Sequence, residues 1–175
     1  MIASFVFSSS SLAARSEFEF SPPPEFKEER SLFGDDRSFV LPGLNGEALA
    51  RITISRIEEQ GPILSVQAPP TVDQLNQVFL AGRSSGLEIL GFSHWTISQS
   101  SLERVGSTGI FLYKVQGQYL NPNRISMSYL EWHYIRGNVS FQLGWTQRSV
   151  GNSDPSFQYA RQVLARFKFL SDQGR

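Results

Sequence analysis

Three side chains have the types that acid–base or nucleophilic chemistry needs. Glu131 and His133 are two residues apart, so on a β-strand both point to the same face and can touch. A histidine held by a carboxylate can act as a general base, but we favour a satisfied ion pair. Ser93 lies in Gly91-Phe92-Ser93-His94-Trp95, which invites comparison with a nucleophile elbow. The second glycine of that motif is replaced by Trp95, and no helix is expected to follow, so the sequence does not indicate a hydrolase.

Sequence motifs for metals, nucleotides and nucleic acids are absent. His94 and His133 are the only histidines, neither lies in an H-E-x-x-H pattern, and there is no cysteine. No glycine-rich phosphate loop occurs. The 16 basic residues balance 16 acidic ones without forming the basic block that nucleic-acid binding requires. We therefore predict no metal, no cofactor and no nucleic-acid partner. No apolar run approaches the roughly 20 residues of a transmembrane segment.

A long β-hairpin between Thr108 and Gln147 is the element that must position Glu131 and His133. Gly137-Asn138 suits its two-residue turn, because glycine takes positive φ without steric cost. Pairing the flanks about this turn gathers one apolar face, which we predict to lie in the core: Leu130, Trp132, Tyr134, Phe141, Leu143 and Trp145.

The opposite face of the hairpin mixes an aromatic ring with hydrogen-bonding groups. A tyrosine among polar neighbours is typical of a protein contact surface, since the ring supplies energy and the neighbours fix orientation. The simpler alternative is that a helix covers part of this face and water the rest. Our candidate binding residues are therefore Tyr129, Glu131, His133, Gln142 and Thr146.

The remaining segments predict further strands and two helices. Residue alternation favours strands at 17–21, 38–41, 48–57, 87–98 and 109–120, with irregular connections at 26–37 and 100–106. Thr71 offers a capping box with Gln74, and apolar spacing then predicts a helix over 72–83. Asp154-Pro155 begins a last helix, whose apolar stripe should close the core: Phe157, Ala160, Val163, Leu164 and Phe167.

This order of elements predicts one α+β domain, in which helices cover an antiparallel sheet of about six to seven strands. The domain is expected to span residues 17–170, with a tail at 171–175. Residues 1–16 predict a leader or a disordered segment. They hold a short apolar run, a serine tract and small residues, an arrangement similar to that of an export signal before its cleavage site. This similarity favours a periplasmic or lumenal location.

Several local patterns resemble the PsbP-like superfamily, which includes photosystem extrinsic PsbP, the Ran-binding Mog proteins and the bacterial DcrB-like proteins. An early strand holds Arg51-Ile52-Thr53-Ile54-Ser55-Arg56, and Val105-Gly106-Ser107-Thr108-Gly109 precedes the central strands. The last helix ends in Ala165-Arg166-Phe167-Lys168-Phe169. Together with the order of elements, the resemblance covers roughly residues 18–170.

The resemblance implies a PsbP-like fold and a non-catalytic accessory or assembly factor that binds a protein partner, so we expect no enzyme activity. Three alternatives stay open. The 14 Phe, 5 Tyr and 3 Trp are material for the pocket of a small apolar-ligand carrier. Ile54-Ser55-Arg56 followed by Gln60-Gly61 is similar to the bacterial Eag chaperones, which suggests a secretion-effector chaperone or an immunity-type protein. A weak hydrolase using Ser93 or His133 is the last alternative.

Overall fold

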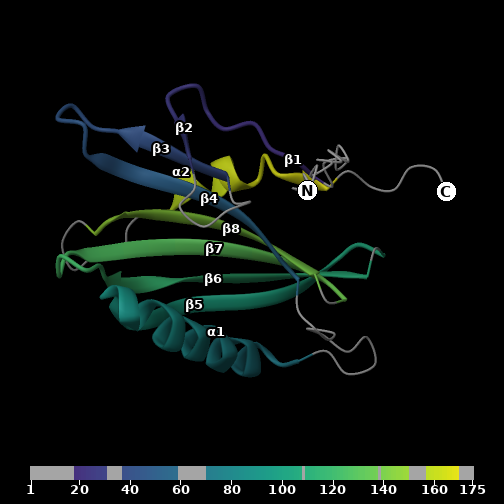
Figure 1. Ribbon diagram of the computed structural model, residues 1–175. Coiled ribbons are helices and arrows are strands. Elements are labelled where there is room, and N and C mark those ends of the chain that lie inside the picture. Colours follow the sequence, from purple (N-terminus) through teal and green to yellow (C-terminus); the bar gives the residue numbers. More distant parts are fainter. Residues whose placement is uncertain are drawn as a thin grey trace, which may run out of the picture.

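The computed structural model describes residues 18–30, 37–58, 70–107, 109–137, 139–149 and 157–169. Its centre is a seven-stranded antiparallel sheet with the strand order β2-β3-β4-β8-β7-β6-β5 (Figure 1). These strands are β2 (Lys27–Arg30), β3 (Arg37–Pro42), β4 (Ala48–Glu58), β5 (Ser93–Val105), β6 (Ile110–Leu120), β7 (Ser126–Arg136) and β8 (Val139–Arg148). A second, two-stranded sheet pairs β1 (Phe18–Glu19) with β9 (Lys168–Phe169). The predicted α+β class and seven antiparallel strands are confirmed.

The central hairpin has the register that the sequence predicts. Arg136 pairs with Val139 and Leu130 with Trp145 across β7 and β8, and Gly137 in the turn has φ +61°. All six residues of the predicted apolar face are buried in one cluster. A register shifted by one residue would exchange the two faces, so the turn and the core agree.

Helix α2 (Gln158–Leu164) covers that apolar face. The residues predicted for the stripe of the last helix are all buried: Phe157, Ala160, Val163, Leu164 and Phe167. The helix itself is shorter than predicted, because it ends at Leu164 and Lys168–Phe169 form the strand β9. The rings of Phe20, Phe26 and Phe39 complete this cluster beside α2. The predicted helix start at Asp154-Pro155 lies outside the described residues, as do residues 1–16, most of the 58–70 loop and the tail at 171–175.

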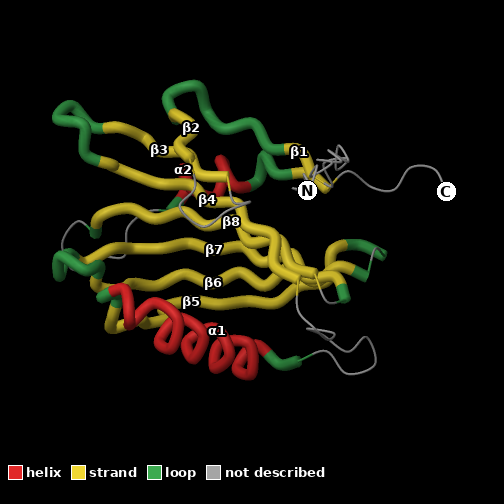
Figure 2. The backbone as a smooth tube through the Cα atoms, in the orientation of Figure 1, coloured by secondary structure: helices red, strands yellow, loops and turns green. Residues whose placement is uncertain are grey.

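Helix α1 (Val72–Leu87) lies on the opposite face of the sheet, over β5, β6 and β7 (Figure 2). Its predicted capping box is present, because the Thr71 hydroxyl accepts from the Gln74 N–H and the Gln74 side chain accepts from the Thr71 N–H. The helix is longer than predicted, and Gly82 and Gly86 lie within it. Each helix covers only part of one face.

Two predicted connections are strands in the structure. The charged segment within 26–37 contains β2, which pairs with β3 although it has no apolar alternation. The strand predicted at 87–98 is confirmed only over residues 93–98, and the turn predicted at 100–106 is wrong because most of it is strand. Leu87 ends α1, a 3₁₀ turn η1 (Glu88–Leu90) follows, and β5 runs unbroken to Val105. Both missed strands lie at sheet edges, where backbone pairing on one side suffices and polar side chains meet water.

Replacing Phe167 by alanine should lower the free energy of unfolding by about 3 to 5 kcal/mol, as expected for a buried aromatic ring. The ring stacks on Phe18 at 5.1 Å and on Tyr134 at 5.2 Å between centroids. Urea unfolding measures the loss. Val78→Ala on α1, at a side chain that is 70% exposed, is the control and should change the stability little. An unchanged midpoint for Phe167→Ala would remove this ring from the core.

Candidate functional site

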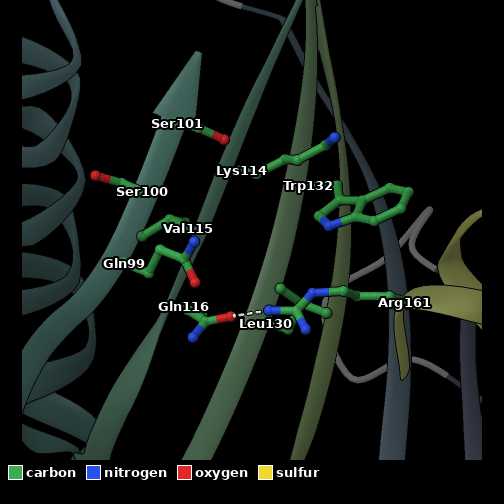
Figure 3. Close-up of a pocket in the computed structure, with 9 residues that line it drawn as sticks. All are labelled: Gln99, Ser100, Ser101, Lys114, Val115, Gln116, Leu130, Trp132 and Arg161. Carbon is green, nitrogen blue, oxygen red and sulfur yellow. Dashed lines mark hydrogen bonds between the residues drawn. The ribbon is translucent and has the colours of Figure 1, made fainter. Parts of the chain in front are cut away.

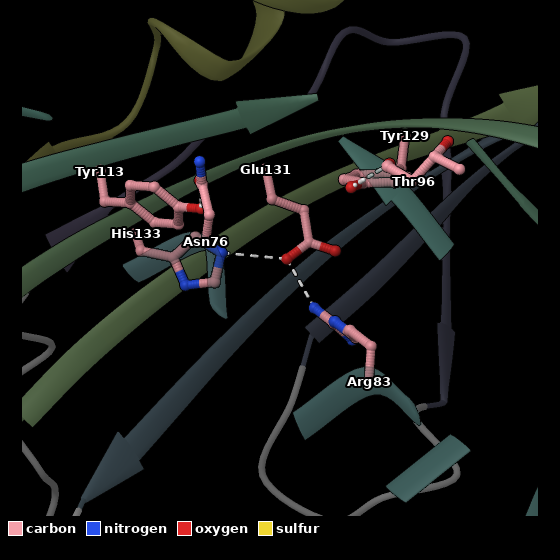
Figure 4. Close-up of polar contacts among 7 residues, drawn as sticks. All are labelled: Asn76, Arg83, Thr96, Tyr113, Tyr129, Glu131 and His133. Atoms are coloured by element: carbon pink, nitrogen blue, oxygen red, sulfur yellow. Dashed lines mark hydrogen bonds and ion pairs between the residues drawn. The ribbon is translucent and has the colours of Figure 1, made fainter. Parts of the chain in front are cut away.

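The carboxylate of Glu131 is the centre of a buried polar cluster between β7 and α1 (Figure 4). Its Oε2 accepts from Arg83 Nη2 of α1 at 2.5 Å and lies 3.0 Å from Nε2 of His133. Glu131 is 6% exposed and His133 is 7% exposed. The pair predicted from the sequence is therefore a three-member ion cluster, completed by a residue from a separate element.

Helix α1 brings Arg83 to this place through Phe79, one helical turn earlier on the same face. The Phe79 ring stacks on Tyr129 at 5.7 Å and meets Trp95 edge-on at 6.5 Å. The guanidinium of Arg83 lies 5.1 Å from the centre of the Phe79 ring and 5.4 Å from that of Trp95. These cation–π contacts hold the guanidinium above Glu131 while its chain packs on the aromatic rings.

Glu131 stays ionised at neutral pH despite its burial. Burial raises the pKa of this carboxyl, but the charge of Arg83 and the hydrogen bond from His133 outweigh it and lower the pKa to about 2. His133 donates from Nε2 to the Glu131 carboxylate, which also accepts a hydrogen bond from Arg83. The guanidinium of Arg83 therefore neutralises the buried carboxylate beneath α1.

Two tyrosines flank the cluster as hydrogen-bond donors. The hydroxyl of Tyr113 donates to Asn76 Oδ1 at 2.7 Å, and that of Tyr129 donates to the carbonyl oxygen of Thr96 at 2.8 Å. Burial, with the nearby charge of Glu131, raises the pKa of both hydroxyls above 10. They therefore stay protonated and fix α1 and β5 to the middle of the sheet.

Gly117 makes the Tyr129 contact sterically possible. Strand β5 has a register shift opposite this glycine. The shift brings the Thr96 carbonyl close to β6. A Cβ atom at Gly117 would lie 1.8 Å from that oxygen and 2.9 Å from the Tyr129 hydroxyl. Only a glycine fits between them.

The structure separates the predicted binding residues into two groups. Tyr129, Glu131 and His133 are buried beneath α1, so for them the helix alternative holds and an exposed contact surface is wrong. Gln142 and Thr146 are half-buried on β8. Sequence reasoning missed Arg83 and Asn76, although Phe79 lies within the predicted helix 72–83, one turn before Arg83 and on the same face.

The residues of the hydrolase alternative are not brought together. Ser93 pairs with Leu120 at one end of the β5–β6 ladder, whereas His133 pairs with Tyr113 near the other end. The Ser93 hydroxyl lies 3.0 Å from Nδ1 of its exposed neighbour His94. The described residues hold no group of three or more His, Cys, Asp or Glu side chains that would bind a metal ion. Nor does the described part contain a helix long and apolar enough to cross a membrane.

A small pocket lies on the opposite face of the sheet, beside α2 (Figure 3). Its volume is about 120 Å³. Residues of β5, β6 and β7 form it, and Arg161 reaches over them from α2 to donate to Gln116 Oε1 at 2.6 Å. Lys114 also lines the pocket, with its Nζ 5.1 Å from the centre of the Trp132 ring. The pocket is lined by polar and cationic groups over an apolar floor.

Comparisons with known proteins identify the fold alone. No protein-family profile matches the sequence, and no curated protein is significantly similar to it. Fifteen solved chains are similar in structure. One is a crystal structure from Bacteroides thetaiotaomicron VPI-5482, with a TM-score of 0.53 and 15% identity. The match covers 91% of this chain and 47% of the Bacteroides chain, so this chain spans about half of that relative. At this identity the likeness does not carry a function.

Glu131→Gln should lower the free energy of unfolding at pH 7 by about 3 kcal/mol, because Arg83 loses its charged partner. The folded-state pKa of Glu131 is below the ordinary 4.5, so the stability it contributes is present above about pH 4.5 and is lost as the pH falls toward 2. The variant should therefore lose less stability than the wild type across this window, as measured by urea unfolding at each pH. Parallel pH curves would contradict the ion cluster. Glu103→Gln, in a half-exposed pair with Lys114, is the matched control and should cost less than about 1 kcal/mol.

Gly117→Ala should destabilise the protein by about 2 kcal/mol or more, since the backbone of β5 must move to admit the methyl group. Gly82→Ala is the matched control. A methyl group there meets no atom within 4 Å, and in a helix it should raise the stability by about 0.5 to 1 kcal/mol. Thermal unfolding of the two variants should move in opposite directions. If both raised the midpoint, β5 would not approach Gly117 as described.

Proposed function

We propose that this chain is a non-catalytic accessory or assembly factor with a PsbP-like domain, and that it binds an extended segment of a partner protein along β5. The observation that carries the proposal is the edge of the sheet. β5 has 13 residues and, among the described strands, pairs only with β6. An edge strand offers a row of backbone N–H and C=O groups, to which another chain can add as a further strand.

The two edges of the sheet differ in how well they suit such binding. β2 has four residues, Lys-Glu-Glu-Arg, and short charged edges resist strand addition. β5 is longer, and its second half from Gln99 to Val105 pairs with β6 without a register shift. The first half contains both register shifts, which disturb a regular edge. The seven residues of the second half are therefore the stretch that we assign to the partner.

The charges of this stretch are directed to β6. Glu103 pairs with Lys114 at 2.5 Å, and the Arg104 guanidinium lies 5.8 Å from the centre of the Phe111 ring. The preceding residues, Gln99, Ser100 and Ser101, are neutral. These three side chains carry no charge, and those of Ser100 and Ser101 are also small. Charges that protect other edges from addition are engaged here with the neighbouring strand.

The non-catalytic part of the proposal is supported by the ion cluster. Glu131 and His133 have the chemistry of an acid–base pair, but both are buried under α1 and paired with each other and with Arg83. The pocket beside α2 is also smaller than the roughly 300 Å³ at which ligand sites begin, which weighs against an apolar-ligand carrier. The PsbP-like resemblance agrees, because its members are typically binding or assembly factors.

A proline pair in β5 tests the proposal. Adjacent strand residues direct their N–H groups to opposite edges, so one of Ser100→Pro and Ser101→Pro removes a ladder bond and the other blocks only the outer edge. The tagged full-length protein is purified from its own source with each substitution, and co-purifying protein is quantified. The proline variant that keeps the wild-type melting temperature should lose its partner at least about tenfold.

Ser100→Ala and Ser101→Ala are the matched controls, since they change the same side chains and keep the amides. Both should retain the partner. Hydrogen exchange of the wild type gives a second reading that needs no variant: the outward-directed amides between Gln99 and Val105 should exchange more slowly once the partner is added. A stable proline variant that keeps the partner, or unchanged exchange in β5, would overturn binding at this edge.

A further inference from the structure

The pocket beside α2 is lined in part by the stretch of β5 to which the partner is assigned. Gln99, Ser100 and Ser101 of β5 contribute to it, so the pocket adjoins the proposed strand-addition site (Figure 3). In strand addition the added backbone supplies affinity, and pockets for its alternate side chains supply specificity. At about 120 Å³ the pocket has the size for one side chain of a bound segment, below that of a small-molecule site.

The charges in the pocket favour an anion. Lys114 and Arg161 both contribute to its lining, and Glu103 neutralises Lys114 alone. Arg161 donates to the neutral amide of Gln116, and within the described residues no carboxylate lies within 4.0 Å of its guanidinium. In the part of the chain that the structure describes, the charge of Arg161 in the pocket lining is thus left without a carboxylate. A guanidinium is well suited to a carboxylate, which it can bind with two hydrogen bonds.

The floor of the pocket favours glutamate over aspartate. Leu130 and Trp132 are both buried and line the pocket, and Lys114 Nζ lies over the Trp132 ring. Two methylene groups of a glutamate can pack on this floor while the carboxylate meets the cations above it. One methylene group of an aspartate covers less apolar surface.

The distance from the added strand can be spanned. A strand added to β5 lies two strand spacings, about 10 Å, from the β6 backbone that carries Lys114. Ser101, which pairs with Lys114, stands between them with a short side chain. A glutamate of the added strand and Lys114 can therefore meet above Ser101. A bulky residue at position 101 would close this passage.

We propose that this pocket binds a glutamate side chain of the partner segment, through Arg161 and Lys114. The inference rests on strand addition at β5. It narrows the partner to an extended segment in which one acidic residue projects toward the α2 face of the sheet.

A library of random nine-residue peptides, displayed on phage and selected on the full-length protein, tests the inference. The selected peptides should share glutamate at one fixed position. With one synthetic peptide, Glu→Gln in the peptide and Arg161→Gln in the protein should each weaken binding by at least about tenfold. Both changes together should weaken it little more than either alone, because they remove the same contact.

Arg148→Gln is the matched control, since it removes an exposed arginine of β8 outside the pocket and should leave binding unchanged. N-methylation of alternate peptide amides tests strand addition separately from the glutamate pocket. Strand addition predicts that binding is lost with one set of methylated amides and kept with the other.

The results distinguish failure of the glutamate pocket from failure of strand addition. Peptides that show this methylation pattern without a shared acidic residue, or without an effect of Arg161→Gln, overturn the glutamate pocket and leave strand addition intact. Acidic peptides that bind regardless of methylation overturn strand addition at β5, and the inference with it. If no sequence is enriched, the proposed function fails.

Discussion

A carboxylate held beneath a helix is the constraint on which this arrangement depends. Burying the charge of Glu131 costs several kcal/mol, and only well-placed partners offset that cost. His133 lies on the same strand, but Arg83 is available only when α1 lies across β5 to β7 with Phe79 on Tyr129. The ion cluster therefore selects one position of α1, while the surrounding rings supply the buried apolar area.

The two helices cover opposite faces over different parts of the sheet. Seven strands extend about 34 Å across and one helix about 10 Å, so neither helix covers a whole face. Strand sequences follow this stagger. β4 is apolar toward α2, with Ile52 and Ile54 buried, whereas β6 is apolar toward α1, with Tyr113 and Val115 buried. β7 lies under both covers, and most of its residues are buried on both faces. The pocket lies on the β5–β6 side of the α2 face.

The features that could be predicted from the sequence are those that depend on neighbouring residues, such as turns, alternation and helix caps. The turn at Gly137 and the alternation around it determined the register of β7 and β8, and Thr71 marked the start of α1. β2 and the second half of β5 were missed because they are polar and are held by backbone pairing, which alternation does not reveal. Glu131 and His133 were placed together correctly. Their burial was left undecided because the covering helix is remote in the sequence, and the Arg161–Gln116 contact depends on tertiary packing in the same way.

The pairing of β4 with β8 also affects folding during translation. β5 to β8 follow one another as hairpins, but the edge of β4 that faces β8 stays unpaired until β8 is translated, as the pairing of Ile52 with Trp145 shows. The segment between the end of β4 at Glu58 and the start of β8 at Val139 must be translated first. A ribosome needs roughly 4 to 16 s for it, at about 5 to 20 residues per second. During this interval Ala50, Ile52 and Ile54 have no core to enter. The apolar face of the nascent β3–β4 hairpin therefore stays exposed until β8 has been translated, which makes this hairpin prone to aggregation during synthesis.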